Sequence, residues 1–298
     1  MTARQLLAAT TIGDGVARAC QSAGLTWCGV GLVVGTFSSG FYVSAAETVF
    51  AVGGPRIPAG PIHLVLEAPP PPPSDRSMVY LGPDRLWTNS CTIDLSRAAS
   101  HRPTQPSPVQ LRSVAPTLAR LDRGDAVPND VADVWAAVRA AVERSDLHVA
   151  RKLLEGLGSG LTPTGDDVLA GLVLFAHWAD PFSAVPAEVV AHAVTTDLSR
   201  CFLAWAAVGQ SIQPIHDMLE AAGKLASAAG LDSSSTAHNR FDRAVATVAS
   251  IGGSSGKGIL AGLGLAATAC SMWQQSGDGH AYTFVAPRGS TPNSTRSG

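Results

Sequence analysis

The order of apolar and polar residues divides the chain into a strand-rich first part and a helical second part. Several segments are rich in Val, Phe and Tyr and are bounded by Gly and Pro, which is typical of β-strands. Residues 13–23 before them can form one short helix. The predicted strands are residues 27–37, 41–52, 62–67, 78–81 and 86–95.

Proline marks the breaks in this pattern. Residues 69–73 are a run of prolines that cannot join the interior of a sheet, so we expect an exposed loop there. Residues 100–116 contain four prolines and have the composition of a linker. We therefore expect a domain boundary in this segment, with a strand-rich domain over residues 1–115 and a second domain over residues 116–286.

From residue 129 the apolar period becomes helical. Val131, Val134 and Val138 are spaced by threes and fours, with Asn129 or Asp130 available as an N-cap. Asp146 is placed to start the next helix. Further predicted helices cover residues 187–208, 215–229, 237–250 and 258–273. The fold class expected is α+β, with a strand-rich domain followed by an α-helical bundle that has glycine-rich turns at its helix N-termini.

Composition and charge limit the classes of function. The 298 residues are 46% apolar, enough to bury a substantial core, and the formal net charge is −2. A nearly neutral chain lacks the basic surface of a nucleic-acid-binding protein. The sequence shows no apolar run of membrane-spanning length, and its N-terminus does not resemble a signal peptide, so we expect a cytoplasmic protein. The polar residues 287–298 are expected to be disordered.

Metal binding has little support in the sequence. The five cysteines and eight histidines are dispersed, with no Cys-x-x-Cys motif and no cysteine and histidine at metal-ligand spacing. We expect buried thiols and no metal site formed by these residues.

The densest chemical signal is the glycine-rich block over residues 156–171. Its exposed backbone N–H groups and hydroxyl groups, together with the positive end of the following helix, suit an anionic ligand. Two acids, Asp166 and Asp167, follow in the first turn of that helix and oppose a bare anion. A proton, an amide N–H, a lysine or a Mg²⁺ ion at Asp166 and Asp167 would resolve this conflict. The expected substrate-binding residues in this block are Gly158, Ser159, Gly160, Thr162 and Thr164.

A second glycine-rich turn covers residues 251–262. It does not fit a nucleotide-binding P-loop, because the spacing before Lys257 is short and Gly258 occupies the position of the Mg²⁺-binding hydroxyl. Residues 256–265 align with residues 165–174 with six identities in ten.

Either this similarity is a coincidence of an Ala-rich composition, or the two helices pack side by side through Gly171 and Gly262. In the second case both helix N-termini point at one shared site. That site would contain the candidate catalytic residues Asp166, Asp167 and Lys257 and two further candidate binding residues, Ser254 and Ser255.

The two blocks resemble the bacterial AllH family, which includes a subunit of oxamate carbamoyltransferase of anaerobic allantoin breakdown. The resemblance lies in residues 156–167 with Leu169-Ala-Gly171, and in residues 253–256 with Leu260-Ala-Gly262. The second turn departs from the family pattern, in which a His or Thr near Gly253 and often an acid near Gly258 are expected. The resemblance implies action together with partner subunits.

These observations predict an enzyme or enzyme subunit that acts on a small carbamoyl- or carboxylate-bearing metabolite. The N–H groups of residues 158–160 would hold its anionic end, Asp166 or Asp167 would orient an amide or act as general base, and Lys257 would stabilise negative charge. A stand-alone isomerase, cyclase or lyase of specialised metabolism and a non-catalytic metabolite-binding or scaffolding subunit remain alternatives. A homodimer is also expected.

Overall fold

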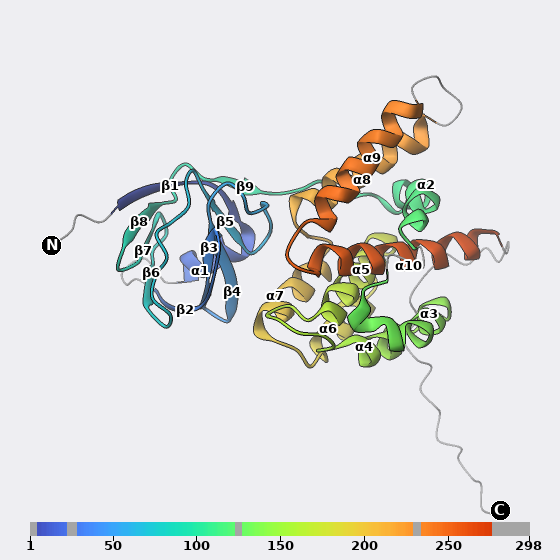
Figure 1. Ribbon diagram of the computed structural model, residues 1–298, viewed down its shortest axis with the longest axis horizontal. Coiled ribbons are helices and arrows are strands. Elements are labelled where there is room, and N and C mark those ends of the chain that lie inside the picture. Colours follow the sequence, from blue (N-terminus) through green and yellow to red (C-terminus); the bar gives the residue numbers. More distant parts are fainter. Residues whose placement is uncertain (1–4, 23–28, 123–126, 229–233, 276–298) are drawn as a thin grey trace, which may run out of the picture.

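The structure is a computed structural model that describes residues 5–22, 29–122, 127–228 and 234–275 (Figure 1). The fold is α+β, as the sequence predicts, with a strand-rich part followed by a helical part. The expected disordered tail, residues 287–298, lies outside the described residues. Within them, no helix is both long enough and apolar enough to cross a membrane.

Nine strands and one helix form the first part, as far as the structure describes it. The helix is α1 (Asp14–Ser22), which confirms the short helix expected there. The strands are β1 (Gln5–Gly13), β2 (Gly29–Phe37), β3 (Gly40–Ala45), β4 (Thr48–Gly53), β5 (His63–Leu66), β6 (Met78–Leu81), β7 (Arg85–Trp87), β8 (Cys91–Asp94) and β9 (Ala99–His101).

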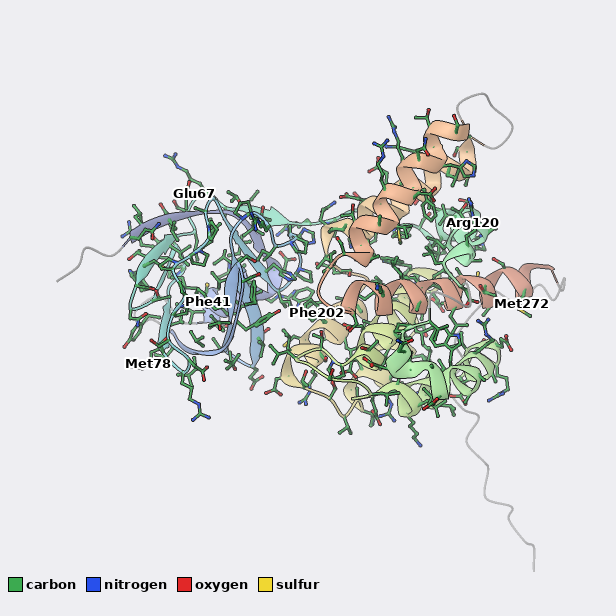
Figure 2. All side chains as sticks on the ribbon, in the orientation of Figure 1. Phe41, Glu67, Met78, Arg120, Phe202 and Met272 are labelled. Carbon is green, nitrogen blue, oxygen red and sulfur yellow. The ribbon has the colours of Figure 1, made fainter. Side chains whose placement is uncertain are left out.

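These strands close into a barrel. Eight of them follow the order β5-β4-β3-β2-β6-β7-β8-β1, and β1 pairs with β5 to complete the ring, while β9 adds to β1 in parallel. Closure leaves few unpaired backbone groups at sheet edges. The barrel has its own apolar core, in which Phe41, Phe50 and Ile62 are fully buried (Figure 2 labels Phe41).

Several strands differ from the expected ones, among them the segment over residues 86–95, which forms the two strands β7 and β8. The expected strand over residues 41–52 is the hairpin β3–β4, whose turn residues Ala46 and Glu47 both have positive φ angles, +48° and +61°. Hairpin turns of this kind normally carry Asn or Gly, so Ala46 and Glu47 are no signal for a turn. Strand β1 was not predicted at all, although it pairs with β5, β8 and β9.

The helical part of the described chain consists of α-helices and two short 3₁₀ segments. They are α2 (Pro108–Leu118), η1 (Ala119–Leu121), η3 (Asn129–Val134), α3 (Trp135–Glu143), α4 (Leu147–Leu154), α5 (Thr164–Ala179), α6 (Val185–Ala191), α7 (Asp197–Ala206), α8 (Gln213–Ser227), α9 (Ser234–Ala249) and α10 (Ser255–Gln275).

Two of the helical expectations need correction. Part of the expected linker over residues 100–116 is helix α2, because Ser107 and Gln110 form a capping box and Pro108 takes a first-turn position that prolines tolerate. The single helix expected over residues 187–208 is broken into α6 and α7, and the Thr196 side chain caps the second of these.

Helix α5 is the centre of the helical core. Most of its residues are buried, and α10, α7, α4, α6 and α2 pack around it (Figure 1). The barrel joins this core mainly through α7. The backbone N–H of Val49 in β4 donates to the Sγ of Cys201 at 3.2 Å, and Phe202 lies between the two parts in Figure 2.

Candidate functional site: two repeated glycine turns and the cleft beside them

The turn between α4 and α5 and the turn between α9 and α10 are built alike. In the first, Leu157 N–H donates to the Leu154 carbonyl at 3.0 Å, and Gly165 N–H donates to the Leu157 carbonyl at 2.8 Å. In the second, the equivalent bonds are Ile251 N–H to the Val248 carbonyl and Gly256 N–H to the Ile251 carbonyl, each 3.0 Å. The sequence similarity of the two blocks therefore reflects a repeated helix–turn–helix unit.

Close backbone approach explains one glycine in each turn. A Cβ built on Gly165 would lie 2.0 Å from the Leu154 carbonyl oxygen, and one on Gly256 would lie 1.8 Å from that of Val248. Any larger residue at either position would push the second helix of its unit away from the first.

The two units pack through their second helices. A Cβ on Gly171 would lie 2.3 Å from the Ile259 carbonyl oxygen, and one on Gly262 would lie 2.1 Å from that of Val168. This confirms that α5 and α10 lie side by side through these two glycines. Near the N-termini, a Cβ on Gly258 would lie 2.7 Å from the Asp167 Cβ, so Gly258 leaves the space that the Asp167 side chain occupies.

Hydroxyl groups join the two helix N-termini. Thr162 and Ser255 lie 2.9 Å apart at their oxygens, and Thr164 and Ser254 lie 3.0 Å apart. Two candidate binding residues of the first block, Thr162 and Thr164, are thus in direct contact with Ser255 and Ser254 of the second.

The Asp166 carboxylate accepts hydrogen bonds from two residues of the helical part. Its Oδ1 accepts the Gly156 N–H at 2.8 Å, its Oδ2 accepts the Thr195 hydroxyl, and its side chain is buried. A carboxylate with both oxygens occupied in this way fixes the loop and the segment before α7. The geometry therefore supports a structural function for Asp166 more than a catalytic one.

Asp167 has a different environment. Only 6% of the residue is exposed, and its Oδ2 has no hydrogen-bond partner. Burial raises the pKa of Asp167 to about 8; the nearby Asp166 charge adds to this rise, and a hydrogen bond with Ser255 opposes it. Burial and the proximity of Asp167 also raise the pKa of Tyr42 in β3, which places Asp167 on the side that faces the barrel.

The loop residues expected to bind an anion lie at the surface. Gly158, Ser159 and Gly160 are exposed, and Gly158 and Gly160 have φ angles of +107° and +103°, which favour glycine. At the start of α5, the N–H groups of Asp166 and Asp167 are directed to the Pro163 carbonyl. Anion binding by residues 158–160 stays a prediction.

Mg²⁺ binding at Asp166 and Asp167 stays a prediction. Asp166 already accepts two hydrogen bonds from the chain, and Asp167 is buried beside it. Mg²⁺ prefers ionised oxygen ligands in open octahedral geometry. Among the residues that the structure describes, no group of three or more His, Cys, Asp or Glu side chains is arranged to hold a metal ion.

A cleft of about 650 Å³ opens beside the Thr164–Ser254 contact. Its walls are apolar and come from η1, α9 and α10, with Leu121, Phe241 and Leu260 among them. Polar groups of several kinds project into the same space. They are Arg120, Asn129, Asp130, Asp242, Ser254 and Lys257.

Asp130 links this cleft to the glycine block. Its Oδ2 accepts the Thr164 hydroxyl at 2.6 Å, and Thr164 in turn meets Ser254. Gly158 lies over this contact, because a Cβ there would be 2.9 Å from the Thr164 nitrogen and 3.2 Å from the Asp130 Oδ2. The function of Gly158 in the structure is thus to leave room for the Asp130–Thr164 hydrogen bond.

Sequence reasoning found two of the polar residues in the cleft and missed the others. It singled out Ser254 and Lys257, and it assigned Asn129 and Asp130 only to a helix start. Arg120 and Asp242 gave no local signal, because they come from η1 and α9 and meet only in the folded chain (Figure 2 labels Arg120).

Residues 154–267 match the AllH family. Its model is described as oxamate carbamoyltransferase subunit AllH, so the resemblance of the two glycine blocks is confirmed over this segment. The AllH match begins at the last residue of α4 and ends within α10, and it includes both turns, Asp242, Ser254 and Lys257. Arg120 and Asp130 precede it. No curated protein and no solved structure matches the chain.

Proposed function

We propose that this chain is a subunit of an enzyme that transfers a carbamoyl group to or from a small carboxylate, and that the cleft beside Lys257 binds that metabolite. One observation carries the proposal: Lys257 and Arg120 line the same cleft of about 650 Å³ beside the junction of the two AllH-matching turns. The family description names a subunit, which supports partner subunits in the complete enzyme.

The polar groups of the cleft suit a molecule that carries both a carboxylate and an amide. Arg120 and Lys257 are cations able to hold a carboxylate or a phosphate, and Asn129 can donate to either. Asp130 and Asp242 supply acceptors for N–H groups. The apolar residues Leu121, Phe241 and Leu260 line the same cleft and can contact the uncharged part of the ligand. A molecule with a carboxylate alone would leave the two acids without a donor, and a molecule with an amide alone would leave the two cations without an anion.

One residue of the cleft, Lys257, is proposed to assist transfer. Lys257 would stabilise the negative charge that develops when the carbamoyl carbon is attacked. Asp167 does not line this cleft, so general acid or base action by Asp167, whose pKa is raised to about 8, stays a separate prediction. Asp166 then acts by holding the loop in place.

Calorimetric titration of the purified chain with oxamate and with carbamoyl phosphate tests this proposal. We expect saturable binding of at least one of them, weakened tenfold or more by Lys257→Ala. Lys224→Ala is the matched control, because Lys224 lies on α8 outside the cleft and pairs with Glu220. Equal weakening by both substitutions, or no binding by the wild type, would contradict the proposal.

A further inference from the structure

We infer that Asp130, Thr164 and Ser254 form an oriented hydroxyl relay that makes the cleft select a ligand with an N–H donor over a ligand of the same shape without one. This inference rests on the proposed function, since it concerns the same cleft. It adds the feature of the ligand that is recognised and the residues that recognise it.

The direction of the hydrogen bonds follows from the number of protons. Thr164 has one hydroxyl proton, and at 2.6 Å it is donated to the Asp130 carboxylate, which only accepts when ionised. In the contact between Thr164 and Ser254, at 3.0 Å, the Ser254 hydroxyl is then the donor and Thr164 Oγ1 is the acceptor. The relay therefore runs from Ser254 through Thr164 to Asp130.

Packing fixes the positions of the oxygens in the relay. Thr164 is fully buried, and its threonine side chain is stiff at χ1. Gly158 closes over the Thr164–Asp130 bond so tightly that a Cβ would lie within 3.2 Å of Asp130 Oδ2 and of Thr164 Oγ1. Thr164 Oγ1 is thereby held 2.6 Å from Asp130 Oδ2, and a hydrogen bond of that length to a carboxylate favours donation to Asp130 over donation to Ser254.

The chemical consequence appears at Ser254, which lines the cleft and is half-buried. With its proton committed to Thr164, its Oγ offers only lone pairs to a ligand, and charge from Asp130 through the relay makes it a stronger acceptor. An amide NH₂ group satisfies this acceptor, whereas a methyl group in the same place leaves it without a partner.

Oxamate and pyruvate provide the test, because they have nearly the same shape and differ in an NH₂ group against a CH₃ group. Calorimetric titration of the full chain with each gives the ratio of the two dissociation constants. We expect wild type to bind oxamate about tenfold more tightly than pyruvate. Ser254→Ala and Thr164→Val should bring this ratio close to one. Thr247→Val, on the exposed side of α9, is the matched control and should keep it.

The outcomes separate the relay from the proposed function. Equal binding of oxamate and pyruvate by wild type, both weakened by Lys257→Ala, overturns the relay and leaves the binding cleft in place. Failure of wild type to bind either overturns both. A ratio unchanged by Ser254→Ala also overturns the relay. Ser254 is half-buried, so this variant gives an answer even where Thr164→Val does not fold.

Discussion

Gly171 and Gly262 meet where α5 crosses α10, and a Cβ built on Gly171 would lie 3.1 Å from the Gly262 Cα. This approach of two backbones holds the N-termini of both helices within hydroxyl contact of one another, so that Ser254 reaches Thr164. The candidate cleft depends on that geometry, because Lys257 and Ser254 belong to one helical unit and Thr164 belongs to the other.

The glycine contact predicts a strong effect of one methyl group. Gly262→Ala should lower the free energy of unfolding by about 1–3 kcal/mol, because its Cβ meets the Val168 carbonyl at 2.1 Å. Gly223→Ala in α8 is the control: its nearest neighbour, Val114 Cγ1, is 3.9 Å away, and alanine favours helix, so stability should stay or rise. Thermal unfolding measures both. A Gly262→Ala variant as stable as the wild type would contradict the close packing of α5 against α10.

We expect Asp166 to contribute to the stability of the fold. Asp166→Ala removes the acceptor of the Gly156 N–H and of the Thr195 hydroxyl, so we expect a loss of about 1–3 kcal/mol in the free energy of unfolding. Asp146→Ala, which removes the ordinary cap of α4, should cost only about 1 kcal/mol. Chemical denaturation compares the two. A smaller loss for Asp166→Ala than for Asp146→Ala would speak against the structural assignment.

The raised pKa of Asp167 predicts that the stability of the fold decreases as pH rises. The folded chain keeps the proton of Asp167 up to about pH 8, whereas an unfolded aspartate loses it near pH 4. Between these values the folded state binds more protons, so the contribution of Asp167 to stability is complete below pH 4 and is lost as pH rises toward 8.

Asp167→Asn removes this titration. The melting temperature of the variant should therefore fall less than that of wild type between pH 5 and pH 8. Melting curves in a series of buffers decide the matter. Parallel curves for the two proteins would show that Asp167 titrates normally in the folded chain.

Much of the helical core and the glycine contact were predictable, because their signals are local. Apolar residues at helical spacing, the N-cap Asp146 and the repeated Leu-Ala-Gly-Leu sequence each act through near neighbours. The six identities between the two blocks also pointed to Gly171 and Gly262 before any contact was known.

Features that depend on distant partners were missed. Strand β1 has a mixed Ala and Thr pattern, and it is stabilised by pairing with β5, β8 and β9. The residues of the cleft meet from η1, η3, α9 and α10, so Arg120 and Asp242 carry no motif. Asp166 and Asp167 are neighbours in sequence and both are buried, but they differ in hydrogen bonding, which the sequence alone does not show.

The β3–β4 turn offers a gain in stability. Glu47 has a φ angle of +61°, a conformation that costs a non-glycine residue about 1–2 kcal/mol. Glu47→Gly should raise the free energy of unfolding of the barrel by part of that amount, about 0.5–1 kcal/mol. Thermal unfolding provides the measurement, and Glu67→Gly in the barrel is a control that should not stabilise, since Glu67 Oε1 accepts the Ala8 N–H. A fall in stability with Glu47→Gly would contradict the turn conformation.

The most direct test of the binding cleft is a crystal structure of the chain with oxamate. The account predicts ligand density between Lys257 and Arg120, with the amide group toward Ser254. A second cavity of about 820 Å³ lies between α2 and α8 beside His216, and it offers an independent place for a small molecule. Oxamate bound there, or against the barrel side of Asp167, with the Lys257 cleft empty, would contradict the central claim.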